Sequence, residues 1–235
     1  MITSLMEQKA EYVRQQLCLK EQIDTVHTIK AEEIRQVAGV DLAYWKEEDG
    51  EEYAVCCIVV LDYASREVVE KRYCMDRVAV PYIPGCLAFR ELPLFFQAKE
   101  LLENDPDLYV FDGNGYLHPR NMGIATHAGI LLDKPSIGIA KTYYKIADTD
   151  FIMPENRAFA YENIVLDGEV SGRAVRTQKD VKPIFLSIGN KIQLDTAMEI
   201  VRHLTTKESH IPLPTRLADW MTHEVRREVI SCKKN

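Results

Sequence analysis

The stretch LYVFDGNGYLHPRNMGIATH, residues 108–127, decides the fold and indicates where the chemistry takes place. Its first four residues are apolar and favour β-structure, and the turn formers Asn104, Asp105 and Pro106 precede them. This pattern predicts a buried strand that ends at Asp112. Because ligands of open α/β sheets bind beyond the carboxyl ends of the strands, we expect the Asp112 carboxylate to face a crevice.

A glycine-rich loop follows this strand. Gly113 and Gly115 carry no side chain and permit positive φ, so a substrate could approach the backbone closely. Asn114, His118 and Arg120 place polar groups beside them. An ordinary strand-to-helix connection with a capping aspartate has the same local pattern, so residues elsewhere in the chain must decide between the two interpretations.

A helix is predicted directly after this loop. Ile124, Ala128, Leu131 and Leu132 form an apolar stripe with helical spacing. The first amides of the helix, next to Gly123, are expected to be free for phosphate oxygens.

Composition predicts one domain spanning residues 1–235. The chain has 46% hydrophobic residues with only 11 Gly and 10 Pro, which argues against disorder. Its net charge of −7 gives no general attraction for nucleic acid, so such binding would need a local basic surface or metal ions. We find no Cys-x-x-Cys pair, no signal-peptide pattern and no apolar run of the roughly 20 residues that a membrane helix needs. We therefore expect a cytoplasmic protein without membrane contact, and a monomer.

The order of the predicted elements indicates an α/β fold. An amphipathic helix at about residues 4–23 is expected to pack on the core, followed by a strand at 34–45 and an antiparallel hairpin at 54–61 and 67–73. Helices and strands then alternate, which predicts a mixed sheet with the hairpin at one side, later strands parallel, and helices flanking the sheet. The later strands are predicted at residues 108–112, 136–140, 164–166, 173–176 and 184–188, and the later helices at residues 91–102, 124–132 and 196–204 and after Pro214.

Two carboxylates interrupt segments that should be buried. Asp41 lies within the first predicted strand, and Glu91 shares a helical stripe with Phe95 and Ala98. Since Pro93 is expected only in a first helical turn, Glu91 should lie at the N-terminal end of its helix. A buried carboxylate needs hydrogen-bond donors or a cation; for Asp41, a strand-end position in solvent fits the local sequence equally.

The loop before that helix, VPYIPGCLAFRE from residue 80, contains two prolines that bracket Tyr82 and Ile83. Each proline fixes its own φ and extends the residue before it, so the loop is expected to be stiff. A stiff loop that holds out Tyr82 could insert the ring into a base stack. The alternative is a tyrosine that packs on the core.

Lys141 and Asp219 are less conspicuous. Lys141 follows a predicted buried strand and should emerge at the same sheet edge as Asp112, where an ammonium can neutralise a phosphate. Asp219 lies early in the last predicted helix. Taken singly, Lys141 would pass for a solvated strand end and Asp219 for a surface helix residue.

Together these segments resemble endonuclease V, a family of the RNase H-like superfamily. The matching motifs, in order, are VAGVDLAY (37–44), PYIPGCLAFRE (81–91), FDGNGYLHPRNMGIATHAG (111–129), PSIGIAKT (135–142), VKPIFLSIGN (181–190) and IPLPTRLAD (211–219). Three residues depart from the family pattern. Cys86 stands where an aromatic is usual, Asn190 where His is usual, and Leu213 where Glu is usual.

The resemblance implies a deoxyribonuclease V-type endonuclease that recognises hypoxanthine in single- or double-stranded DNA. It would cut the second phosphodiester bond on the 3′ side of the lesion, leave 5′-phosphate and 3′-hydroxyl ends, and so initiate repair. Mg²⁺ is the implied cofactor, with Mn²⁺ able to substitute, because oxygen-only ligands suit these ions. An inosine-specific ribonuclease and a non-cleaving nucleic-acid-binding protein of the same fold remain as alternatives.

Matching the motifs position by position assigns the roles of individual residues. The resemblance makes Asp41, Glu91, Asp112, Asp219 and Lys141 catalytic, with Asp41, Asp112 and Glu91 as metal ligands. Hypoxanthine offers N1–H as a donor and O6 as an acceptor where adenine offers the reverse, so backbone groups of the glycine loop could distinguish these bases once the base leaves the stack. The expected substrate-binding residues are Tyr82, Ile83, Pro84, Gly85, Gly113, Asn114, Gly115, His118, Arg120 and Gly123.

Overall fold

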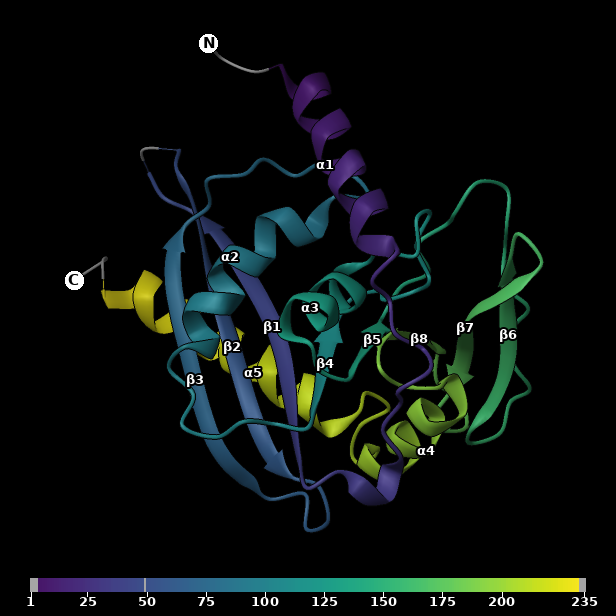
Figure 1. Cartoon of the computed structure of the whole chain (residues 1–235). Coiled ribbons are helices and arrows are strands. Elements are labelled where there is room, and N and C mark those ends of the chain that lie inside the picture. Colours follow the sequence, from purple (N-terminus) through teal and green to yellow (C-terminus); the bar gives the residue numbers. More distant parts are fainter. Residues whose placement is uncertain (1–3, 49, 233–235) are drawn as a thin grey trace.

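A computed structural model describes residues 4–48 and 50–232, which form one mixed sheet covered by helices on both faces (Figure 1). The strand order is β3-β2-β1-β4-β5-β8-β7-β6. Residues 1–3, 49 and 233–235 of the predicted domain lie outside this description. The strands are β1 (Gln36–Lys46), β2 (Glu52–Asp62), β3 (Val68–Arg77), β4 (Leu108–Asp112), β5 (Ser136–Ala140), β6 (Ala160–Leu166), β7 (Glu169–Arg176) and β8 (Ile184–Asn190).

The predicted mixed α/β sheet is confirmed, but one part of its topology was predicted wrongly. Strands β1, β2 and β3 form the expected antiparallel part, and β4 and β5 extend the sheet parallel to β1. The later strands β8, β7 and β6 are antiparallel to their neighbours, not parallel. A parallel neighbour of β5 would need a helical crossover. The chain instead forms the β6–β7 hairpin after β5 and returns along β8 without a helix.

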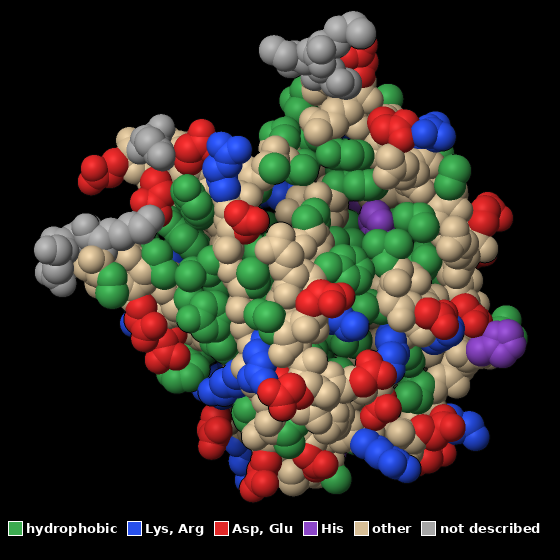
Figure 2. Space-filling view, turned by 60° about the vertical axis from the view of Figure 1, so that its left-hand side comes forward, with side chains coloured by type: hydrophobic (Ala, Val, Ile, Leu, Met, Phe, Trp, Pro, Cys, Tyr) green, Lys and Arg blue, Asp and Glu red, His purple; other side chains and the backbone are tan. Residues whose placement is uncertain are grey.

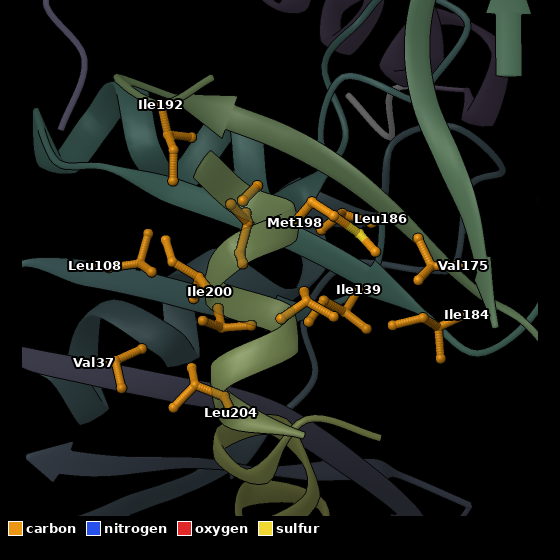
Figure 3. Packing of buried hydrophobic residues seen from close by; sticks show 14 of the residues in the cluster. Val37, Leu108, Ile139, Val175, Ile184, Leu186, Ile192, Met198, Ile200 and Leu204 are labelled. Carbon is orange, nitrogen blue, oxygen red and sulfur yellow. The ribbon is translucent and has the colours of Figure 1, made fainter. Parts of the chain in front are cut away.

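Alternating side chains of the central strands supply both apolar layers. Leu108 and Val110 of β4 face a cluster that includes α4, whereas Tyr109 and Phe111 face a cluster that includes α2 and α3. The first cluster surrounds α4 closely, as Figure 3 shows for Ile200 and its neighbours. The helices are α1 (Leu5–Lys20), η1 (Ala31–Glu33), α2 (Leu87–Lys99), α3 (Ile124–Leu132), α4 (Leu194–Leu204) and α5 (Leu213–Cys232).

The N-terminal helix α1 is shorter than predicted and makes different contacts. It ends at Lys20, and its apolar residues Leu5 and Leu17 are 57% and 50% exposed. The buried residue of α1 is a polar one, Gln16. Tyr12 is half-buried and stacks on Phe89 of α2, with 4.0 Å between the ring centroids, so α1 packs on the body of the protein through an aromatic ring as well as an amide side chain.

The helix that carries Glu91 begins earlier than predicted. Helix α2 starts at Leu87, after Cys86 in the N-cap position, and Pro93 lies inside it. Glu91 is thus in the second turn instead of at the N-terminal end, and it is buried. The rule that confines proline to a first turn failed here, because a proline inside a helix costs one hydrogen bond and some strain that surrounding packing can offset.

The three departures from the family pattern are accommodated in the structure, where Cys86 is buried at the N-cap of α2. The buried Asn190 amide accepts from the Asp24 backbone N–H and donates to the Gly129 carbonyl, so it joins the loop after α1 to α3. Leu213 packs against the cluster around α4.

Among residues 4–48 and 50–232, no helix is both long and apolar enough to cross a membrane.

Candidate active site

The strand register explains why two of the predicted carboxylates meet. In the parallel pair of β1 and β4, Val40 lies beside Phe111, so the next residues along the strands, Asp41 and Asp112, are neighbours. Asp41 is two residues before Ala43, which packs in a cluster with Val225 of α5. Because side chains alternate along a strand, Asp41 also faces α5.

Asp219 of α5 completes an acidic triad. Asp41, Asp112 and Asp219 each offer a carboxylate oxygen, and these oxygens lie within 4.8 Å of one another. Thr222, one turn after Asp219, donates a hydrogen bond to the Asp219 carbonyl at 2.8 Å. Its hydroxyl oxygen also lies 3.3 Å from a carboxylate oxygen of Asp41. One turn of α5 therefore fixes the helix against β1.

Lys141 directly follows β5 and joins two members of the triad. Its Nζ lies 2.6 Å from Asp112 Oδ2 and 2.8 Å from Asp219 Oδ1. The structure thus brings the lysine to the sheet edge that the sequence predicted. Burial alone would lower the pKa of Lys141, but the two carboxylates raise it above its usual range. The side chain therefore carries a positive charge within the cluster.

Burial and mutual repulsion alter the carboxyl groups. The pKa of Asp41 is raised to about 7, chiefly by burial and then by the negative charge of Asp112. Burial also raises the pKa of Asp112, and Lys141 counteracts this in part. Ionising these carboxyl groups is costly, and a cation beside them would favour the ionised form.

Glu91 is close to the triad, but its carboxylate is not one of those whose oxygens lie within 4.8 Å of one another. Its Oε1 accepts a hydrogen bond from Tyr44 Oη at 2.7 Å, and burial raises its pKa to about 8. Tyr44 follows Asp41 by three residues on β1 and therefore faces α2, on the opposite side of the sheet from Asp219. The three carboxylates whose oxygens lie within 4.8 Å of one another are those of Asp41, Asp112 and Asp219, and the ligand set of Asp41, Asp112 and Glu91 stays a prediction.

Sequence reasoning missed Tyr44. Nothing in a strand-forming tyrosine indicates that its hydroxyl will hold a buried glutamate. Its ring also carries the Arg90 guanidinium 4.6 Å from the ring centroid, and Arg90 pairs with Glu52 at 2.6 Å. Neighbouring positions of α2 therefore contact the same tyrosine.

A cavity lies between the proline loop and the glycine loop. Five predicted substrate-binding residues line it: Tyr82, Gly85, Asn114, His118 and Gly123. Tyr82 is 60% exposed, so its ring is held out from the core. The remaining lining residues, which the sequence did not single out, are Leu87, Ala88, Met122, Ile124 and Tyr144.

The other predicted binding residues do not line this cavity. Ile83 is buried, and Arg120 is directed to the Gly85 carbonyl, 2.6 Å from its Nη2. Gly115 is needed for packing, because a Cβ there would lie 2.1 Å from the Ile188 carbonyl oxygen of β8. Gly113 has φ of +149°, and a Cβ there would meet Ile124. Pro84 also lies outside the lining.

The start of α3 is less open than predicted. Its N-cap is Gly123, which has no side chain that could cap the helix. The Ala125 amide, however, donates to the Asn114 carbonyl at 3.1 Å. This bond uses one of the amides that we expected to be free for phosphate. It also holds Asn114 against the helix. The Asn114 Oδ1 is buried and has no hydrogen-bond partner within the described part of the chain.

The donor set fits a hard divalent cation. The triad offers carboxylate oxygens only, which Mg²⁺ and Mn²⁺ prefer, whereas zinc sites usually contain His or Cys. The triad could therefore hold a metal ion. On the face of the molecule shown in Figure 2, acidic and basic side chains intermingle, so that face has no single broad basic area to attract a polyanion.

The fold and the site together define a class: hydrolases with an RNase H-like sheet and an acidic cluster at its edge. Residues 17–220 match the sequence model of the Endonuclease V family. Endonuclease V of Bacillus subtilis is 53% identical over 221 residues, which cover 94% of this chain and 92% of that protein. This chain therefore belongs to the Endonuclease V family, and it is an endonuclease that hydrolyses phosphodiester bonds.

Solved structures agree with this assignment. The crystal structure of Endonuclease V from Bacillus subtilis matches with a TM-score of 0.91 at 52% identity, over 97% of this chain and 94% of that one. Endonuclease V of Ciona intestinalis, in complex with a 24mer DNA containing an inosine followed by a ribo-adenosine, has a TM-score of 0.83 at 30% identity. That match covers 95% of this chain and 99% of the Ciona chain. The predicted RNase H-like fold is thereby confirmed.

Proposed function

We propose that this protein is a metal-dependent endonuclease of DNA repair that recognises hypoxanthine in DNA. It cuts the second phosphodiester bond on the 3′ side of the lesion and acts as a single-domain monomer. The observation that carries the proposal is the short segment of chain that joins the acidic triad to the cavity. Asp112 belongs to the triad, and Asn114, two residues later, lines the cavity. A base held in the cavity would therefore keep its own strand next to the carboxylates.

The cavity has features of a site for a base turned out of the helix. Enzymes that act on a damaged base extrude it into a pocket and read its Watson–Crick edge. Asn114 Oδ1 is a buried acceptor without a partner in the described residues. It could accept the N1–H of hypoxanthine, whereas the N1 of adenine has no proton to donate. The exposed ring of Tyr82, at the mouth of the cavity, could fill the gap left in the stack.

The residues of the triad and Lys141 would share the work of hydrolysis. A divalent ion, Mg²⁺ or Mn²⁺, supplies charge neutralisation and an activated water when bound. Asp41, Asp112 and Asp219 would hold it, and Glu91, kept in place by Tyr44, is the remaining carboxylate near the cluster. Lys141 places an ammonium at the same edge, where it can pair with a phosphate oxygen once a cation takes over its carboxylate partners.

One observation favours a second substrate class. The nucleic acid in the Ciona complex carries a ribonucleotide directly after the inosine. An inosine-containing RNA, or a strand with a ribose at that position, is therefore the second candidate substrate for this chain.

The test uses matched single strands of DNA and RNA, each with one inosine or with adenine in its place. Wild-type protein with Mg²⁺ should cut the inosine DNA at the second phosphodiester bond 3′ to the lesion and leave the adenine control intact. EDTA should abolish cleavage, and Mg²⁺ or Mn²⁺ should restore it, whereas Ca²⁺, which coordinates more loosely, should not. Full activity in EDTA would overturn the metal proposal, and equal cutting of the adenine strand would overturn the proposed specificity.

A further inference from the structure

Helix α1 stacks Tyr12 on Phe89 of α2, and its one fully buried residue is polar. Gln16 has 0% exposure, although it is a polar side chain on a helix whose apolar residues Leu5 and Leu17 are exposed. If α1 served only to cover apolar surface, an apolar residue would occupy the buried position. A fully buried amide is retained at a cost unless all its polar atoms find partners.

Each polar atom of the Gln16 side chain has a partner in the two loops that form the cavity. Nε2 donates to the Gly85 carbonyl at 3.1 Å and to the Met122 carbonyl at 3.2 Å. Oε1 accepts from Arg120 Nε at 2.7 Å. Gly85 lies at the end of the proline loop, just before the N-cap of α2. Met122 lies at the end of the glycine loop, just before the N-cap of α3. One side chain from α1 thus connects the two walls of the cavity.

The Gly85 carbonyl is the point at which these contacts converge. Besides Gln16, it accepts from Arg120 Nη2 at 2.6 Å, and His118 Nε2 lies 3.1 Å away. His118 Nδ1 faces the backbone amides of Arg120 and Met122. Since those amides can only donate, Nδ1 is the acceptor and Nε2 carries the proton. The histidine therefore also donates to the Gly85 carbonyl.

The backbone at Gly85 depends on this arrangement. Its φ is +77°, and a Cβ would lie 2.9 Å from Arg120 Nη2. The residue lies three positions after Tyr82 in the same loop. Gly85 and Met122 also line the cavity, and Gln16 fixes both of their carbonyls.

We propose that Gln16 is a positioning residue for the base-binding cavity. It joins Gly85, Met122 and Arg120 so that the proline loop and the glycine loop keep the spacing that a deaminated base requires. This inference rests on the proposed function and extends it to α1, outside both loops. Gln16 makes no hydrogen bond to the acidic triad or to Lys141, so it acts on recognition of the base and not on hydrolysis.

The test replaces Gln16 by Met, which keeps the length of the side chain but removes its three hydrogen bonds. The matched control is Gln15→Met on the same helix, because Gln15 is exposed and bonds only to Glu11 among the contacts of its side chain. Steady-state cleavage is measured on inosine-containing and unmodified DNA with Mg²⁺. Melting temperatures are recorded for each protein.

Gln16→Met should raise KM for the inosine strand by about tenfold or more, because three buried polar groups lose a partner. The kcat at saturating substrate should stay within about twofold, and the preference for inosine over the unmodified strand should fall. Gln15→Met should behave as wild type. Gln16→Glu keeps an acceptor for Arg120 but sets a carboxylate against the carbonyls of Gly85 and Met122, so it should also raise KM. This variant tests the positioning role of Gln16 if Gln16→Met does not fold.

Two results would overturn the inference. One is a folded Gln16 variant with wild-type KM and wild-type preference for inosine. The other is an equal loss of kcat and kcat/KM with unchanged preference, which would make Gln16 a purely structural residue. A wild-type protein that shows no preference for the inosine strand would instead contradict the proposed function, so the two failures are distinguishable.

Discussion

Replacing Glu91 by Gln should stabilise the metal-free protein, and the gain should grow with pH. Glu91 is buried, and its pKa rises from 4.5 in the unfolded chain to about 8 in the folded protein. Between these values the folded state holds a proton that the unfolded state has released. The stability that protonated Glu91 provides is therefore complete below pH 4.5 and is lost as the pH rises through 8.

The size of the effect follows from the shift. Each pKa unit corresponds to about 1.4 kcal/mol, so the shift from 4.5 to about 8 makes the loss between pH 4.5 and 9 about 5 kcal/mol. Glutamine has nearly the same shape and keeps an oxygen that can accept the Tyr44 hydroxyl, which now lies 2.7 Å from Glu91 Oε1. The variant therefore avoids the cost of a buried charge without opening a cavity or leaving Tyr44 unpaired.

The assay is urea unfolding in EDTA at pH 5 and pH 9, comparing wild type with Glu91→Gln. The free energy of unfolding of the variant should exceed that of wild type by a few kcal/mol at pH 9 and by much less at pH 5. Glu100→Gln, at the exposed C-cap of the same helix, serves as the control for the charge change. A gain that is the same at both pH values, or a loss at pH 9, would refute the reasoning.

Three further predictions concern the site itself. Asp112→Asn should reduce cleavage by several orders of magnitude while binding of uncut inosine DNA stays equal or tightens, because the variant loses one negative charge and one of the carboxylates proposed to hold the metal. Near-normal cleavage in an activity assay would assign the residue a capping role. Tyr82→Ala should weaken binding by roughly 1–3 kcal/mol in a titration, the usual contribution of a stacked aromatic, without lowering the melting temperature, because the ring is 60% exposed. Lys141→Met should lower the stability of the metal-free protein more at pH 8 than at pH 4, because burial raises the pKa of Asp112 and more of this carboxyl is protonated at pH 4. Equal losses at the two pH values would contradict the role of Lys141 as a counter-ion of Asp112.

The sequence predicts the central strands well because their signals are local. Strand β4 is an uninterrupted apolar run that ends at Asp112, and β5 has the same character, so both were placed at their observed bounds. The direction of β8 depends instead on residues 143–181, whose polar, irregular pattern does not reveal the β6–β7 hairpin. Without that hairpin, the alternation of helix and strand pointed to a parallel sheet.

The acidic site was predictable in its members but not in its grouping. Four carboxylates could be matched to family motifs, yet only the register of β1 against β4 places Asp41 beside Asp112. The face on which each side chain lies then separates Asp219 from Glu91. Gln16 gave no signal at all, because a glutamine on a helix rich in Glu, Lys and Arg looks solvated until the fold places it between two loops.

The acidic site explains why this part of the protein is costly for stability and suited to catalysis. The fold forces Asp41, Asp112 and Asp219 together at a buried sheet edge, where repulsion and burial raise the pKa values of Asp41 and Asp112. Before any cation binds, Lys141 and bound protons supply the compensating charge. A divalent ion that displaced them would gain the attraction of carboxylates already held in place. The unfavourable charges of the free protein would therefore favour the binding of a cation.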